Sequence, residues 1–116
     1  MIVEKKHLDN FTVLYVEGLI KLGESAEFFS SALENVLKNE NTNVIIDFTK
    51  IDYIDSTGIG ELVGYLGKFS NQNRKLVLVN PSDRIQKLLK LAKLDSVFKI
   101  YSSEEEAVAT EGGATE

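Results

Sequence analysis

The decapeptide Ile51–Gly60 reads Ile-Asp-Tyr-Ile-Asp-Ser-Thr-Gly-Ile-Gly, and it separates two kinds of hydrophobic periodicity. Before it, Val44–Phe48 is a nearly continuous apolar run, as in a strand that is covered on both faces of a parallel sheet. After it, apolar side chains recur at the spacing of one helix face, at Ile59, Leu62, Val63 and Leu66. The decapeptide is therefore predicted to lead from a buried strand into a helix. Ser56 would lie at the exposed start of that helix, where a serine typically acts as the N-cap.

Strand and helix patterns also alternate on the amino-terminal side. Ile2–His7 and Phe11–Val16 are short runs rich in β-branched and aromatic residues. The dipeptide Asp9–Asn10 between them predicts a tight turn, so that the two strands form an antiparallel hairpin that ends at Gly18. Ser25–Lys38 then has the periodicity of a helix.

On the carboxyl side, Leu76–Val79 is a second buried strand. The dipeptide Asn80–Pro81 predicts the start of a third helix, with Asn as N-cap and Pro at the first helical position. Val97–Tyr101 is the last predicted strand. Alternation of this kind indicates an α/β domain with parallel strands.

The end of the chain combines a capping box with a polar tail. Ser103 and Glu106 have the spacing of a capping box, which predicts a small last helix through about Thr110. Glu111–Glu116 has little to bury and is predicted to be a disordered tail. We find no internal repeat and no linker. We therefore expect a single domain over residues 1–110, with a mixed sheet of about five strands and about four helices.

Composition restricts the class of protein. The chain has 116 residues, of which 43% are hydrophobic and 27% charged, a balance typical of soluble globular proteins. The absence of cysteine excludes disulfides, thiolate metal sites and cysteine catalysis, and it agrees with a cytoplasmic location. The formal charge of -5 argues against nucleic acid and anionic membranes as partners. No targeting segment and no apolar run of about 20 residues is present.

Four glycines occur within the helix that is predicted to follow Ser56: Gly58, Gly60, Gly64 and Gly67. A glycine inside a helix costs about 1 kcal/mol relative to alanine, so this many glycines indicate close approach of another surface. Contact with the chain's own sheet could explain Gly64 and Gly67. Gly58 and Gly60, in the first turn, would leave the backbone accessible to a partner.

The segment Asp55–Gly60, Asp-Ser-Thr-Gly-Ile-Gly, resembles the Asp-Ser-(Ser/Thr)-Gly-(Leu/Ile)-Gly segment of the STAS domain family, which sulphate transporters and anti-sigma factor antagonists share. The resemblance covers nearly the whole chain, from the opening hairpin to Leu94–Ile100, and Asn80–Pro81 fits it as well. A chain this short carries no transporter, so it is most similar to the freestanding antagonists.

The resemblance implies a phosphorylation switch. In this family, the serine that follows the aspartate is phosphorylated by a partner that is both a serine kinase and an anti-sigma factor, and a serine phosphatase reverses the modification. Carried over to this chain, the phosphorylated residue is Ser56. No base, metal cluster or nucleotide motif in the sequence supports an enzyme, so we expect no enzymatic activity and no cofactor. The expected partner-binding residues are Asp55, Ser56, Thr57, Gly58, Ile59 and Gly60 together with Lys21, and the expected state is a monomer or weak dimer.

Lys21 departs from the family's pattern. Many antagonists have an acidic segment after the second strand, of the type Gly-Glu-(Leu/Ile)-Asp, and Lys21 stands where its Asp is expected. The lysine could alter kinase recognition, pair with a phosphate, or mark a partner other than an anti-sigma factor. The alternative function is a scaffold subunit of a transport or stress-signalling complex that does not switch.

Other polar groups give weaker signals. His7 is the only histidine, and a single histidine near a turn is usually structural or solvated. Carboxylates that could chelate Mg²⁺ more often cap loops and helices, and we expect no metal at Asp47, Asp52 and Asp55. A basic run on the third helix is usually a solvated face, with docking of an acidic partner as the alternative, at Arg84, Lys87, Lys90 and Lys93.

Overall fold

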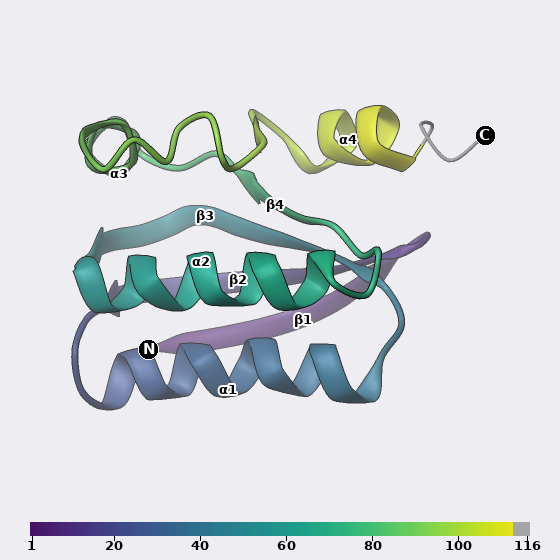
Figure 1. Cartoon of the computed structure of the whole chain (residues 1–116), viewed down its shortest axis with the longest axis horizontal. Helices are drawn as coiled ribbons and strands as arrows, with labels where there is room; N and C mark the ends of the chain where they lie inside the picture. The colour runs from purple at the N-terminus through teal and green to yellow at the C-terminus, as the bar shows by residue number, and fades with distance from the viewer. Residues whose placement is uncertain (113–116) are drawn as a thin grey trace.

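The computed structural model describes residues 1–112 and contains one sheet with helices around it (Figure 1). The strands are β1 (Ile2–Leu8), β2 (Phe11–Ile20), β3 (Asn43–Ile54), β4 (Leu76–Val79) and β5 (Ile100–Tyr101). The helices are α1 (Glu24–Asn39), α2 (Ser56–Ser70), α3 (Asp83–Leu91) and α4 (Glu104–Ala107), and a π-helical turn, η1 (Val108–Gly112), follows α4.

The sheet has five strands in the order β1-β2-β3-β4-β5. β1 and β2 are antiparallel, and they are joined by a turn in which Asp9 has a positive φ of 54°. All other neighbouring strands are parallel. The predicted α/β fold, with an antiparallel hairpin leading into parallel strands, is therefore confirmed.

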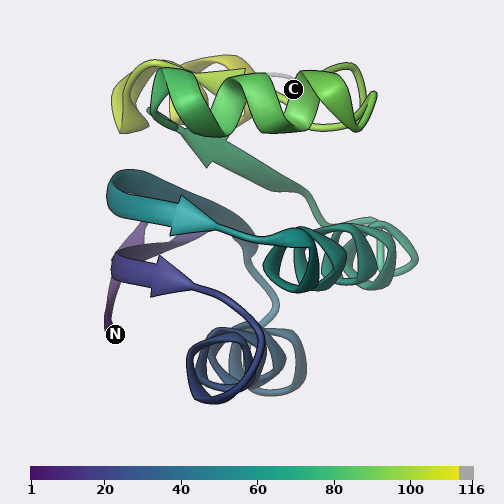
Figure 2. The same ribbon diagram turned by 90° about the vertical axis from the view of Figure 1, so that its left-hand side faces the viewer.

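The two faces of the sheet are covered differently. On one face, alternate residues such as Leu14 and Ile46 form the larger core with Phe29 of α1, Leu62 of α2 and Ile85 of α3. α1 and α2 lie side by side on this face (Figure 2). On the other face, a smaller core is closed by Ala107 of α4, which packs with Phe11, Val13, Ile45, Val77 and Val79. α4 is short, so part of this second face stays open.

Several predicted boundaries are wrong for identifiable reasons. β2 continues past Gly18 to Ile20, because Gly18 adopts a φ of 113° beside a register shift and the pairing with β3 then resumes. The third helix does not begin at Asn80–Pro81. Ser82 is its N-cap and accepts a hydrogen bond from the Ile85 N–H at 3.2 Å, whereas the Asn80 side chain donates to Thr49 at 3.1 Å.

The end of the chain also differs from expectation. The last strand is confined to Ile100–Tyr101. The Ser103 hydroxyl accepts from the Glu106 N–H at 3.1 Å, as the capping box predicts, but the Glu106 carboxylate accepts from the Ser102 N–H instead of that of Ser103. Glu111 is not part of a free tail: it is 3% exposed and lies in η1. The rest of the predicted tail, residues 113–116, lies outside the described residues.

Glu40 links the hairpin to the end of α1. Its carboxylate oxygens lie 2.7 Å from Lys5 Nζ and 2.6 Å from His7 Nε2, and the Thr12 hydroxyl donates to it at 2.6 Å. Burial alone would raise the pKa of Glu40, but the hydrogen bonds from Lys5, Thr12 and His7 outweigh it and lower the pKa from 4.5 to about 2. Protonation of Glu40 is therefore expected to destabilise the folded chain.

We expect the stability contributed by Glu40 to be present above pH 4.5 and to be lost as the pH falls toward 2. Because Glu40 binds a proton less tightly in the folded chain than in the unfolded chain, protonation favours unfolding. Urea denaturation across this range should show a steeper fall in the free energy of unfolding for wild type than for Glu40→Gln. Asp52→Asn, at an exposed position, is the control. Equal pH dependence in wild type and Glu40→Gln would contradict the assignment.

Candidate functional site

Asp55, not Ser56, caps the helix that follows the decapeptide. The Asp55 side chain accepts a hydrogen bond from the Gly58 N–H at 3.0 Å, and its second oxygen accepts from the Leu22 N–H at 2.9 Å. The Asp55 N–H itself donates to the Ile20 carbonyl at 3.0 Å. The prediction that Ser56 is the N-cap is therefore wrong. An aspartate is favoured here because its two oxygens serve two donors from different segments.

Ser56 is the first residue of α2, and its side chain is exposed. Within residues 1–112 its hydroxyl has no hydrogen-bond partner, since Asp55 already performs the capping. Thr57, the neighbouring hydroxyl residue, is partly buried. Ser56 is thus the more accessible of the two hydroxyls.

The Asp55 carboxylate carries a negative charge beside Ser56. Backbone hydrogen bonds from Leu22 and Gly58 lower the pKa of Asp55 below its ordinary value. The positive end of the α2 dipole favours the same charge. An anionic group and an exposed hydroxyl therefore stand next to each other at the start of α2.

The glycines of α2 have different surroundings from those predicted. Gly58 is buried, and a Cβ atom there would lie 2.7 Å from both Ile20 Cγ2 and Ile54 Cγ1. Gly58 thus lets the first turn of α2 approach β2 and β3, and the expectation that its backbone is accessible is wrong. Gly60 is exposed as predicted. Gly64 and Gly67 would place a Cβ in open space, so contact with the sheet does not explain them.

An apolar surface adjoins Ser56 at the carboxyl ends of β2 and β3. Leu19 and Tyr53 are direct neighbours in the register of the two strands, and both are exposed. Leu22, whose N–H is bonded to Asp55, is 77% exposed. We refer to Leu19, Leu22 and Tyr53 as the apolar rim. We did not single out these residues from the sequence, although outward-facing Glu17 and Leu19 continue the strand alternation past Gly18.

Lys21 lies in the loop between β2 and α1, immediately before Leu22. Ser25 holds this loop in place: its hydroxyl accepts from the Lys21 N–H and donates to the Lys21 carbonyl, both at 3.0 Å. The Lys21 side chain is exposed and forms no ion pair with any residue in the described part of the chain. Of the predicted site residues, the structure brings Lys21, Asp55 and Ser56 to one corner of the fold and turns Gly58 inward.

Neither His7 nor Asp55 is available as a base at this corner. His7 is bonded to Glu40 at the far end of the hairpin, and both oxygens of Asp55 are engaged by backbone N–H groups. Among residues 1–112, no group of three or more His, Asp or Glu side chains is arranged to hold a metal ion. None of the helices over the same range has the length and apolar character that a membrane span requires.

The chain belongs to the STAS domain family, whose pattern matches residues 3–107. It is 30% identical over 100 residues to the anti-sigma-B factor antagonist of Listeria monocytogenes, a match that covers 86% of this chain and 83% of the relative. The predicted family is therefore confirmed.

Solved structures show the same fold. The crystal structure of TM1081 from Thermotoga maritima matches with a TM-score of 0.85 and 25% identity, over 93% of this chain and 92% of that one. The anti-sigma factor antagonist SpoIIAA of Bacillus, in its unphosphorylated form, matches with a TM-score of 0.80 and 20% identity, over 97% of each chain. The phosphorylated form of SpoIIAA matches with a TM-score of 0.72.

Proposed function

We propose that this chain is an anti-sigma factor antagonist that binds a serine kinase/anti-sigma factor through the corner around Ser56, and that phosphorylation of Ser56 ends this binding. The observation that carries the proposal is the exposed Ser56 hydroxyl, which is not used to cap α2 because Asp55 is the N-cap. The relatives named as antagonists support the partner class. A serine phosphatase would restore the binding form.

A phosphate on Ser56 would change the interface without unfolding the domain. It adds about -1.5 to -2 charges next to the Asp55 carboxylate, and those charges would have to lose water in a complex. The Asp55 cap does not use the Ser56 hydroxyl, so the hydrogen bonds to Gly58 and Leu22 survive the modification. The helix N-terminus favours the added charge by about 0.3–1 kcal/mol. Modification thus acts on binding and leaves the fold intact.

The apolar rim gives the unmodified corner a surface to bury. Leu19, Leu22 and Tyr53 are exposed beside Ser56, and apolar side chains of this kind supply most of the favourable free energy of association. A phosphate at the edge of the rim would have to be desolvated together with it. The same contacts that favour the complex therefore make it sensitive to Ser56.

We expect Ser56→Asp to weaken binding of the kinase partner by about 30-fold or more, since an uncompensated charge in an interface costs on the order of 2 kcal/mol. Ser56→Ala should bind like wild type. Proteins retained from host lysate by wild type are identified by mass spectrometry, and the kinase among them is then titrated against all three forms. Circular dichroism of Ser56→Asp checks that the fold is unchanged.

The non-switching scaffold is the second candidate, and Lys21 is the observation that favours it. In that case wild type and Ser56→Asp would retain the same proteins, with no serine kinase among them. Lys21→Asp, which introduces the acidic residue of many antagonists, should then leave the retained proteins unchanged. In a switch, Lys21→Asp should alter the affinity for the kinase.

A further inference from the structure

The open part of the second sheet face carries an ordered row of side chains. In the strand register, Glu4 of β1 lies opposite Tyr15 of β2, and Tyr15 lies opposite Asp47 of β3. Residues that pair across neighbouring strands point to the same face, about 5 Å apart. A tyrosine ring is therefore flanked by a carboxylate on each side.

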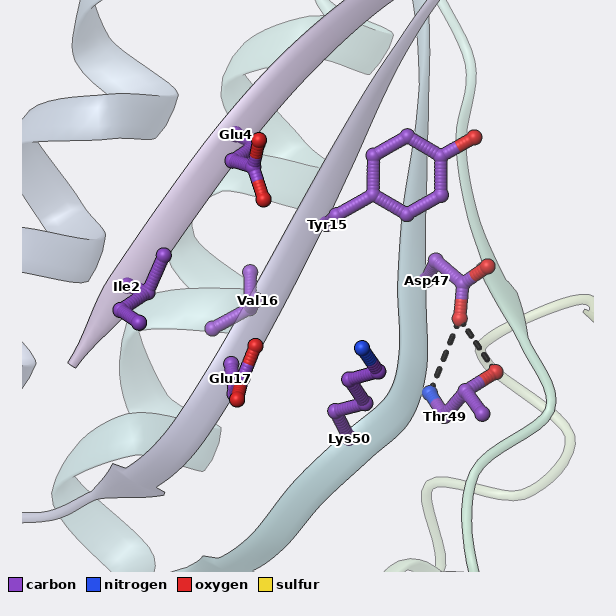
Figure 3. Close-up of a pocket in the computed structure, with 8 residues that line it drawn as sticks. All are labelled: Ile2, Glu4, Tyr15, Val16, Glu17, Asp47, Thr49 and Lys50. Atoms are coloured by element: carbon purple, nitrogen blue, oxygen red, sulfur yellow. Dashed lines mark hydrogen bonds between the residues drawn. The ribbon is translucent and has the colours of Figure 1, made fainter.

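This row forms one wall of a groove of about 310 Å³ (Figure 3). The next row along the strands contributes Ile2, Glu17 and Lys50, again in register. A volume of this size is at the lower end of the range found for small-molecule sites. The groove could thus hold one small ligand on the face opposite α1 and α2.

Asp47 gives the groove a buried charge. It is 9% exposed, and one of its oxygens accepts from the Thr49 N–H at 2.9 Å and from the Thr49 hydroxyl at 2.5 Å. Its second oxygen has no hydrogen-bond partner within residues 1–112. Because no buried side-chain oxygen in the described part of the chain lacks a partner, this second oxygen is reached by solvent and is open to a donor that enters the groove.

The groove is also short of positive charge. Glu4, Glu17 and Asp47 form no ion pair within the described residues, and Lys50 is the one cation among the lining residues. In Figure 3 the ammonium end of Lys50 is turned toward the row of Tyr15 and Asp47, although it forms no ion pair there. Lys50 is exposed on the strand and can turn outward, so its ammonium group would compete with a ligand cation for this part of the groove.

The Tyr15 ring is held in place by two residues that do not line the groove. Its hydroxyl donates to Glu104 of α4 at 2.8 Å, and Lys6 Nζ lies 3.4 Å from Glu104 and 5.7 Å from the ring centroid. The ring is therefore fixed before any ligand arrives. Pre-positioned aromatic rings attract cations through their negative faces.

We propose that this groove binds a small organic cation, with a guanidinium or ammonium group against Tyr15 and bonded to Asp47 and Glu4. A planar guanidinium suits the site, because it can stack on the ring while its N–H groups reach the carboxylates on either side. The inference concerns this sheet face alone and is independent of Ser56.

The probe is agmatine, which carries a guanidinium and an ammonium group, titrated into the ¹⁵N-labelled full chain at low ionic strength. We expect saturable shifts of the amide signals of Glu4, Tyr15 and Asp47. Asp47→Asn, which keeps the acceptor for Thr49, should weaken binding by roughly tenfold, as loss of a charge-assisted hydrogen bond implies. Lys50→Gln, which removes the competing cation, should strengthen binding by roughly two- to fivefold.

Two controls distinguish specific binding in the groove from general attraction of a cation to an acidic protein. Glu27→Gln removes the same charge from the exposed face of α1 and should leave the affinity for agmatine unchanged. N-butylurea, a neutral molecule of similar size, should give no saturable shift. Shifts that do not saturate, or equal losses in Glu27→Gln and Asp47→Asn, would overturn the proposal. If Asp47→Asn does not fold, Glu4→Gln on the edge strand tests the same row.

Discussion

Arg74→Ala is expected to destabilise the folded chain by about 3–5 kcal/mol, because several buried acceptors lose a charged donor at once. The Arg74 side chain is buried and donates to the carbonyls of Thr42, Leu37 and Val36 at 2.7, 2.9 and 3.1 Å. The guanidinium also stacks 4.6 Å from the centre of the Phe69 ring. One side chain thus satisfies carbonyls at the end of α1 and in the loop before β3, and it packs on the end of α2.

Urea denaturation of three variants tests this assignment. Arg74→Lys keeps the charge but cannot reach three carbonyls in one plane, so its loss of stability should be intermediate. Gln72→Ala removes only the exposed side-chain partner that Arg74 contacts at 2.8 Å, and it should cost less than about 1 kcal/mol. A loss for Arg74→Ala no larger than that for Gln72→Ala would show that water replaces the guanidinium.

Gly58→Ala is expected to destabilise the chain by about 1–3 kcal/mol, the usual cost of an added methyl group in a filled core. The new Cβ would lie 2.7 Å from branch atoms of Ile20 and Ile54, and β-branched side chains yield little at these atoms. The intrinsic helix preference of alanine, about 1 kcal/mol, opposes this cost and does not outweigh it.

Gly64→Ala provides the matched control, since it is the same change in the same helix with open space around the new methyl group. There the helix preference acts alone, and we expect stabilisation by up to about 1 kcal/mol. The two variants should therefore shift the urea midpoint in opposite directions. Stabilisation by both would mean that the first turn of α2 can move away from the sheet.

The local hydrophobic pattern predicted most helices and strands, because the periodicities of helices and strands differ clearly. Phe11–Val16 and Val44–Phe48 are dominated by β-branched and aromatic residues, and helical spacing begins only after a polar break in each case. Boundaries were less predictable. Asp55 and Ser56 are adjacent and both are good caps, and the choice depends on the Leu22 N–H, which comes from a loop 33 residues earlier in the chain.

Glu111, at the end of the chain, is a second residue whose position could not be predicted from the local sequence. Its local sequence is short, polar and rich in glycine, which favours a free tail. The structure instead buries its carboxylate between Lys75 at 3.3 Å and Lys99 at 3.6 Å, with the Tyr101 hydroxyl donating to it. These partners lie on or beside β4 and β5. Only the tertiary arrangement shows that Glu111 holds η1 against the sheet.

The groove at Tyr15 could not be predicted from the sequence either, because it depends on how the strands pair. Glu4 and Asp47 are 43 positions apart in the sequence, and neither belongs to a motif. The register of two different pairings places them on either side of the same ring. Such a row depends on the register between strands, which the sequence of a single strand does not determine.

The strand order β1-β2-β3-β4-β5 has a consequence for how the chain is made. Each strand pairs with the one synthesised just before it, so a chain leaving the ribosome can extend the sheet at an edge that already exists. No strand has to wait for a later one to be inserted between its neighbours. The last described segment is the exception, because Glu111 returns to Lys75, beside β4, after all five strands have been made. Translation that stops just short of Glu111 would thus release a complete sheet in which the last turn lacks its ion pairs to Lys75 and Lys99.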